Sequence, residues 1–274
     1  MIIDSHQHFW KYEPAKHSWI DDDMKAIRRD FLPAELEVVF REQGVAGSVA
    51  VEADQNEAET EYLIALSQQY SYIKGIVGYT DLRAENVAER LDYFSRFPVV
   101  KGFRHVLQSQ DPSFMLQPSF LRGIGMLKAF GFTYDVLVFP QHLKAVKEMI
   151  AQFPDQWFVL DHLAKPYIKK GLIDEWEKDI RELAVFPNLC CKISGMVTEA
   201  DYSNWQTADF TPYLDVVVNS FGTKRLMYGS DWPVCTVAAS YGQVSAIIKD
   251  YFATFSPAEQ EEVFSGNATR FYHL

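Results

Sequence analysis

Two histidines stand two residues apart near the start of the chain, in the run Asp4-Ser5-His6-Gln7-His8. At the end of a β-strand, alternate side chains leave the same face, which would put the Cα atoms of His6 and His8 about 6.6 Å apart. Two imidazoles at that separation can converge on one metal ion. Such a pair is informative only together with its surroundings.

Further ionisable residues follow apolar runs later in the chain. They lie in the segments Gly102-Phe103-Arg104-His105, Leu160-Asp161-His162-Leu163-Ala164-Lys165-Pro166 and Gly229-Ser230-Asp231-Trp232-Pro233. Each has an ordinary structural explanation, since Asp231 could cap a turn, His162 could be a hydrogen-bonded core residue and Arg104 could form a surface ion pair. Those explanations do not account for the shared position at the carboxyl ends of apolar runs.

Apolar, β-branched runs bounded by turn residues predict eight strands. They span residues 2–6, 45–53, 73–80, 99–106, 132–139, 157–162, 189–194 and 225–230, and helical patterns such as 57–70, 84–97, 141–153, 173–186 and 210–221 lie between them. A strand followed by a helix, repeated eight times, is typical of the α/β class and of a closed parallel (β/α)8 TIM barrel. An open doubly wound sheet is the alternative. Since no linker or change of composition divides residues 1–274, we expect a single domain.

A closed barrel would bring the ionisable segments together at one end. Active sites of such barrels lie at the carboxyl ends of the strands, and the eighth strand is next to the first, so Asp231 should lie beside His6 and His8. The long connection 9–43, rich in Trp, Tyr and acidic residues, follows the first strand at the same end. Long loops in compact domains are often functional.

The composition limits the partners. The chain has 274 residues, with 26 basic and 37 acidic side chains and a formal net charge of −11. Without a basic cluster it offers nucleic acid no electrostatic footprint. No apolar run approaches the roughly 20 residues of a membrane span, and Asp4 and His6 interrupt the N-terminus too early for a signal peptide. We therefore expect a cytoplasmic protein whose three cysteines are core thiols.

Nucleotide chemistry has no motif in this chain. Gly123-x-Gly125 lies in a helical pattern rather than after a strand, and neither a phosphate-binding loop nor a Gly-x-Ser-x-Gly elbow occurs. We expect no nucleotide cofactor, no phosphotransfer and no serine nucleophile.

Taken together, the motifs resemble those of the amidohydrolase superfamily, of the amidohydrolase-2 type. The resemblance rests on His6-x-His8 followed by Phe9-Trp10, on the segments around Arg104 and His162, on Ser194-Gly195 and on Gly229-Ser230-Asp231-Trp232-Pro233. It runs from residue 2 to the closing segment 266–272. The chain is most similar to the sugar-lactonase branch, which includes hydrolases of L-fuconolactone, L-rhamnonolactone and 2-pyrone-4,6-dicarboxylate.

The resemblance implies roles for particular residues. His6, His8 and Asp231 would border a divalent-metal site. His162 would lie beside it, and Asp231 would draw a proton from the attacking water. His105 is a further candidate catalytic residue. The candidate substrate-binding residues are Arg104, Trp10, Lys165 and Trp232. A cation can stabilise an oxyanion, and flat aromatic faces stack on sugar rings.

Two-metal members of the superfamily carry a carbamylated lysine or a glutamate late in strand four or five. This chain has Arg104-His105 and Tyr134-Asp135 at those ends, so we expect no bridged pair of metals. The resemblance implies one weakly held Zn²⁺ or Mn²⁺ ion, or none, since the lactonase branch does not always need a metal. Without a metal, His6 and His8 would donate hydrogen bonds to the substrate carbonyl.

The expected reaction is hydrolysis of a sugar-acid lactone of the L-fuconolactone or L-rhamnonolactone class. A dicarboxylate substrate would need several cations, whereas only Arg104 and Lys165 follow the strand ends. Two alternatives are a metal-dependent non-oxidative decarboxylase of the same superfamily and a barrel that binds a sugar acid without converting it. The expected partner is a small molecule, and the sequence predicts no oligomeric state.

Overall fold

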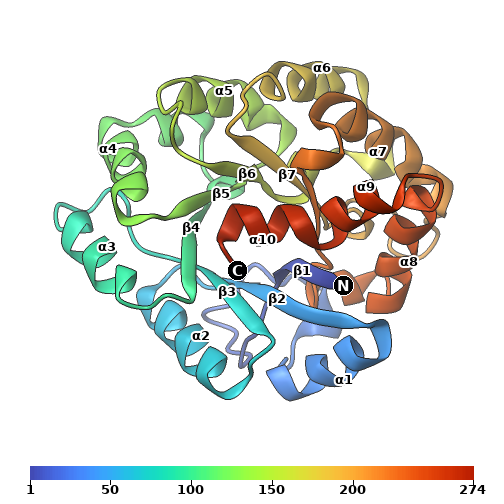
Figure 1. Ribbon diagram of the computed structural model, residues 1–274, viewed down its shortest axis with the longest axis horizontal. Coiled ribbons are helices and arrows are strands. Elements are labelled where there is room, and N and C mark those ends of the chain that lie inside the picture. Colours follow the sequence, from blue (N-terminus) through green and yellow to red (C-terminus); the bar gives the residue numbers. More distant parts are fainter.

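The eight predicted strands form one parallel sheet. The computed structural model describes all 274 residues, and its strands follow one another in the sheet in chain order. Their bounds are Ile2–Gln7 (β1), Val45–Val51 (β2), Ile73–Gly78 (β3), Val100–Val106 (β4), Thr133–Leu137 (β5), Phe158–Leu160 (β6), Leu189–Ile193 (β7) and Leu226–Tyr228 (β8). Helices surround this ring of strands (Figure 1). The predicted (β/α)8 barrel is confirmed.

The sheet closes between β8 and β1, just beyond the end of β8. The backbone N–H of Asp231 donates to the carbonyl oxygen of His6 at 2.8 Å, and that of His8 donates to the carbonyl oxygen of Trp232 at 2.7 Å. Closure therefore uses the segments that carry the candidate ligands. It holds the backbones of β1 and the residues after β8 together at the barrel mouth.

The first eight helices follow the eight strands in alternation, and two further helices come after the eighth at the end of the chain. Their bounds are Pro33–Gln43 (α1), Glu57–Gln69 (α2), Val87–Ser95 (α3), Pro118–Leu127 (α4), Leu143–Ala151 (α5), Asp174–Leu183 (α6), Thr207–Phe221 (α7), Tyr241–Phe252 (α8), Pro257–Glu261 (α9) and Asn267–Tyr272 (α10). In α5, for example, Val146, Met149 and Ile150 recur at helical spacing on the buried face. None of the helices has the length and apolar character needed to cross a membrane.

Segment 9–43 is a long connection only in its first part. Helix α1 occupies its end, begins with a proline in the first turn and stops at Gly44, whose φ of 71° is left-handed. A short 3-10 helix, Lys25–Ile27, lies before it. The expectation of a continuous connection was wrong because α1 buries only Pro33, Leu36 and Phe40, too few to make its helical pattern obvious.

The barrel interior changes from apolar to charged along the strands. The apolar layer consists of Ile3, Val49, Val51, Val77, Val159, Cys190 and Met227 with Ala268, Phe271 and Tyr272 of α10. Figure 1 shows α10 lying across the centre of the ring of strands. A charged layer follows, made of the buried side chains Glu52, Arg104, Asp135, Asp161 and Lys192. The three cysteines are free and buried, as expected.

Strand β6 ends at Leu160, two residues before its predicted end. The residues from His162 to Lys165 instead have positive φ angles, between 50° and 58°. L-amino acids rarely adopt this left-handed conformation, which costs roughly 1 to 2 kcal/mol per residue. The predicted strand 157–162 was therefore wrong at its last two residues, because the chain leaves the sheet there in a tight left-handed turn.

Candidate active site

A bulge in β1 turns both His6 and His8 into the barrel. From Asp4 to Gln7, β1 advances by three residues while the paired β2 advances by two. An extra residue of this kind reverses which face the following side chains take. Ile3 in the apolar layer and the two histidines at the mouth can therefore face the same interior space, although their numbers differ in parity.

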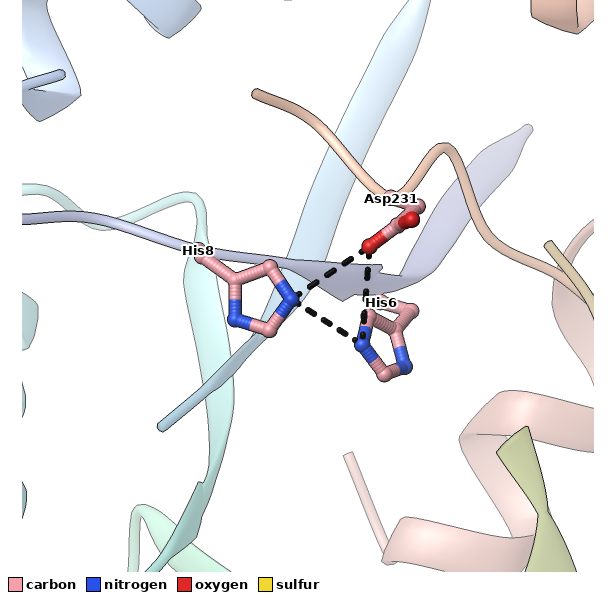
Figure 2. Close-up of side chains that lie close together, drawn as sticks. All are labelled: His6, His8 and Asp231. Carbon is pink, nitrogen blue, oxygen red and sulfur yellow. Dashed lines mark hydrogen bonds and ion pairs between the residues drawn. The ribbon is translucent and has the colours of Figure 1, made fainter. Parts of the chain in front are cut away.

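His6, His8 and Asp231 form a cluster at the mouth (Figure 2). His6 Nε2 is 3.2 Å from His8 Nε2, and these nitrogens are 3.9 Å and 3.4 Å from Asp231 Oδ1. His8 Nδ1 lies 2.8 Å from the carbonyl oxygen of Val51. Because a carbonyl oxygen only accepts, that nitrogen carries the hydrogen and His8 Nε2 keeps its lone pair. The cluster thus presents a donor set suited to a divalent metal.

His162 joins this cluster from the turn after β6. Its Nε2 is 3.9 Å from Asp231 Oδ1, and its ring centroid is 4.4 Å from that of His6. Its Nδ1 lies 2.8 Å from Ser194 Oγ, which anchors the ring. Asp231, like His162, has a positive φ, 58°. Backbone strain of this kind is found at functional sites, where it fixes the direction of a side chain.

The surroundings keep Asp231 ionised. Burial opposes its ionisation, but His162, His8 and His6 together outweigh burial and hold the pKa of this carboxyl well below its usual range. Burial lowers the pKa of His162 to about 4, although Asp231 and Asp161 act in the other direction. Burial also lowers the pKa of His6 well below its ordinary value. At neutral pH the cluster therefore combines the carboxylate of Asp231 with the neutral imidazoles of His6 and His162.

Arg104 reaches the cluster from β4 and is held by two carboxylates. Its Nε donates to Glu52 Oε1 at 2.8 Å and its Nη1 to Asp161 Oδ2 at 3.1 Å. The same Nη1 lies 3.3 Å from His6 Nε2. The side chain is only 4% exposed. Arg104 is thus a fixed cation, neutralised by two carboxylates, next to His6, a candidate metal ligand. The sequence motif predicted its position at the end of the fourth strand but not its two carboxylate partners.

A second buried cation, Lys192 of β7, was absent from the predicted site residues. Its Nζ is 3.2 Å from His6 Nδ1 and 3.1 Å from Asp161 Oδ1, and it donates a further hydrogen bond to Asp135. Tyr272 of α10 donates to the same Asp135 at 2.8 Å. A signal was available in the sequence, since a lysine inside an apolar strand must find buried partners.

Lys165 lies at the end of the left-handed turn, and its charge is paired. Its Nζ is 2.6 Å from Glu199 Oε1, with both side chains largely buried. The aromatic ring of Phe139 lies 5.5 Å away on another side. Contact between Lys165 and a substrate stays a prediction, and it would require the ammonium to share its charge with Glu199.

The two predicted stacking residues are both buried. Trp10 is 2% exposed and donates its indole N–H to the carbonyl oxygen of Arg29 at 2.8 Å. It also lines a cavity of about 240 Å³ between the residues after β1 and the start of α2. Trp232 is 3% exposed and packs edge-on against Phe9 and Phe31. Sugar stacking by either tryptophan stays a prediction.

His105 does not belong to the cluster. It follows Arg104 in β4, so strand alternation sends it to the opposite face of the sheet. Its ring stacks on Phe114 at 4.9 Å and meets Phe120 at 6.0 Å between ring centroids. Burial lowers its pKa to about 4. The catalytic role expected for His105 has no support from this position.

Known proteins resemble the chain over its whole length. A protein-family model described as amidohydrolase matches residues 3–274. The L-fucono-1,5-lactonase of Burkholderia multivorans is 39% identical, over 99% of this chain and 96% of that protein. The L-fucono-1,5-lactonase of Burkholderia ambifaria is 33% identical, over 99% and 95%. The crystal structure of an amidohydrolase from Burkholderia multivorans with bound Zn has a TM-score of 0.95 and 38% identity, covering 100% of this chain and 99% of that one.

Proposed function

The chain belongs to the amidohydrolase family, and we propose that it is a lactonase, an enzyme that opens the ring of a neutral sugar-acid lactone with water. The observation that carries this proposal is the meeting of Asp231 with His6, His8 and His162 at the barrel mouth. Relatives of this chain named L-fucono-1,5-lactonase support lactone hydrolysis and make L-fucono-1,5-lactone the first substrate to test.

Hydrolysis of the ester bond needs a base, an oxyanion partner and an acid. Asp231, ionised at neutral pH, takes a proton from the water that attacks the carbonyl carbon. Two N–H groups are candidates for stabilising the oxyanion: Arg104 Nη1, which lies 3.3 Å from His6 Nε2, and the N–H of neutral His6 when Nε2 carries the hydrogen. When the ring C–O bond breaks, the protonated Asp231 returns its proton to the departing alkoxide.

The residues present fit one divalent metal ion. His6 Nε2, His8 Nε2 and Asp231 Oδ1 would hold it, and the hydrogen bond from His8 Nδ1 to Val51 leaves the His8 lone pair free for this purpose. Bound there, the ion would polarise a carbonyl group and acidify water. The buried charges agree with this: four carboxylates, Glu52, Asp135, Asp161 and Asp231, face two cations, Arg104 and Lys192, which leaves two negative charges when all are ionised.

The pairing of the cations supports a neutral substrate. Arg104 is neutralised by Glu52 and Asp161, and Lys165 is neutralised by Glu199. A dicarboxylate would have to compete with these carboxylates for the same cations. A polyhydroxylated ring needs only hydrogen bonds, so a sugar lactone fits this charge distribution better than a pyrone dicarboxylate.

A pH-stat assay tests the proposal. Proton release is followed with L-fucono-1,5-lactone, an L-rhamnonolactone and 2-pyrone-4,6-dicarboxylate, before and after treatment with a chelator. We expect turnover of at least one neutral sugar lactone and little of the dicarboxylate. Release of CO₂ from an aromatic or unsaturated acid, without lactone turnover, would point to a decarboxylase. Binding of aldonolactones by calorimetry without proton release would point to a barrel that binds but does not convert.

A further inference from the structure

The imidazole of His6 faces two incompatible neighbours at one nitrogen. Its Nδ1 lies 3.3 Å from Asp161 Oδ1, which can only accept a hydrogen bond when ionised. The same Nδ1 lies 3.2 Å from Lys192 Nζ, which can only donate. Nδ1 with a hydrogen satisfies Asp161, and Nδ1 with a lone pair satisfies Lys192. One nitrogen cannot serve both partners, so the two compete for the tautomer of His6.

The choice of tautomer decides what His6 Nε2 can do at the mouth. If Nδ1 accepts from Lys192, Nε2 carries the hydrogen and can donate it to His8 Nε2, 3.2 Å away. That acceptor is available because the other nitrogen of His8 donates to Val51. If Nδ1 instead donates to Asp161, His6 Nε2 has a free lone pair, which a metal ligand needs.

From this geometry we propose that Lys192 is a positioning residue that holds His6 in the tautomer with hydrogen on Nε2, and thereby weakens metal binding by His6, His8 and Asp231. Asp161 favours the opposite tautomer, and so does Arg104, whose Nη1 can only donate and lies 3.3 Å from His6 Nε2. Both residues therefore favour the lone pair on Nε2 that a metal needs. The inference rests on the metal site of the proposed function. It predicts two alternative states of the mouth, one with a hydrogen bond between His6 and His8 and one with an ion between them.

The structure gives Lys192 little freedom to leave this position. Its side chain is 0% exposed, as are those of Asp135 and Asp161. Asp135 is itself fixed by two contacts to the hydroxyl of Tyr272, at 2.8 Å and 3.0 Å. The ammonium therefore keeps its place beside His6, and its positive charge also repels a divalent ion at the neighbouring site.

The affinity of the protein for Zn²⁺ alone tests the inference. Competition with a chromophoric chelator gives the Zn²⁺ dissociation constant of the wild type and of Lys192→Met, and we expect the variant to bind about 10 to 100 times more tightly. Asp161→Asn should bind more weakly than the wild type. Lys101→Met is the matched control, because Lys101 lies at the start of β4 and donates to the carbonyl of His273. Its affinity should equal that of the wild type.

A gain of Zn²⁺ affinity in Lys192→Met would distinguish the proposed role of Lys192 from a merely structural one. General loosening of the site would instead weaken Zn²⁺ binding. If Lys192→Met does not fold, the double variant Lys192→Met/Asp135→Asn removes one charge of each sign and should show the same gain. Nitrogen-15 NMR of the metal-free wild type should show hydrogen on His6 Nε2, with the signals assigned through His6→Gln. Unchanged or weaker Zn²⁺ binding in a folded variant, or hydrogen on Nδ1, overturns the inference.

The same experiment distinguishes this inference from the proposed function. Absence of Zn²⁺ binding in both the wild type and Lys192→Met would overturn the inference together with the metal site, while lactone turnover in the pH-stat would still stand on Asp231. Tight Zn²⁺ binding only after removal of Lys192 would support the inference, whatever the substrate proves to be.

Discussion

Gly195 lies directly against His162: a Cβ atom added at Gly195 would stand 2.6 Å from His162 Nδ1 and 2.7 Å from Cγ of the ring. Gly195 also has a φ of 63°, a conformation that favours glycine. The glycine after Ser194 thus leaves the space in which the ring rests, while Ser194 itself anchors the ring through a hydrogen bond.

Gly195→Ala should therefore displace His162 from Asp231 and lower kcat/KM by about 10- to 100-fold, as a shift near 1 Å does at a catalytic site. The matched control is Gly171→Ala, where φ is 62° and no atom lies within 4 Å of the added Cβ. Both variants bear the conformational cost of a positive φ, but only Gly195→Ala meets the imidazole. Equal kinetics in the two variants would remove His162 from the reaction.

Asp231→Asn keeps the size of the side chain and removes the proton acceptor. We expect the protein to fold and kcat on a sugar lactone to fall by roughly 10² to 10⁴, the usual worth of a positioned base. Steady-state kinetics by pH-stat provide the measurement. Asp215→Asn is the control, since Asp215 is exposed on α7 and accepts a hydrogen bond from Tyr251.

Added Zn²⁺ or Mn²⁺ separates two roles of Asp231. Recovery of kcat in Asp231→Asn at saturating metal would assign Asp231 mainly as a ligand. Failure to recover at full occupancy supports the base. Wild-type kcat in a variant that has lost its metal would contradict both roles, and His162 would then be the next candidate for water activation.

Arg104→Met should lower kcat/KM by a factor equivalent to about 2 to 4 kcal/mol, because it removes a charged hydrogen-bond donor beside His6. It also leaves Glu52 and Asp161 without their shared cation, which should destabilise the fold by about 3 to 5 kcal/mol. Urea unfolding and kinetics on the same sample measure both effects. Kinetics within twofold of the wild type would place Arg104 outside the reaction.

His105 should make the fold less stable in mild acid. Its pKa is about 4 in the folded protein against 6.5 for the free side chain, so between these values the unfolded chain binds a proton that the folded chain does not. The stability associated with His105 is therefore complete above pH 6.5 and declines as the pH falls toward 4. From pH 7.5 to pH 5, His105→Phe should lose about 1 to 2 kcal/mol less stability than the wild type in urea unfolding.

The control for this variant is its turnover at neutral pH. If His105 only packs against Phe114 and Phe120, His105→Phe should hydrolyse the lactone as fast as the wild type. Loss of turnover in a folded His105→Phe protein would instead restore the catalytic role expected from the sequence. An unchanged pH dependence of stability would contradict the packing account.

The strands and their order could be predicted because each is a short apolar run whose period and flanking residues are local properties. The position of Asp231 beside His6 followed from barrel closure, which needs no knowledge of side-chain packing. The direction of His105 was harder, since it depends on the parity of residues within β4. Arg104 and His105 are consecutive in β4, so they point to opposite faces of the sheet. If Arg104 faces the barrel interior, His105 must face away from it.

Glu52, Lys192 and Tyr272 could not be assigned partners in the same way. Each partner lies on a distant segment, and the pairing depends on strand stagger, the β1 bulge and the docking of α10. The sequence did contain one indication, which came from residue type and not from hydrophobic periodicity. A charged residue within a buried strand needs a partner of opposite charge. It shows that a network exists but does not name its members.

The left-handed turn from His162 to Lys165 also bears on how this barrel can be engineered. A search for thermostable variants that scores each position by backbone preference would replace Ala164, with its φ of 58°, by glycine. Variants selected in this way would have less backbone strain in the turn, and this turn directs His162 toward Asp231. Such variants would gain heat resistance at the expense of turnover, so directed evolution of this scaffold should keep residues 162–165 unchanged.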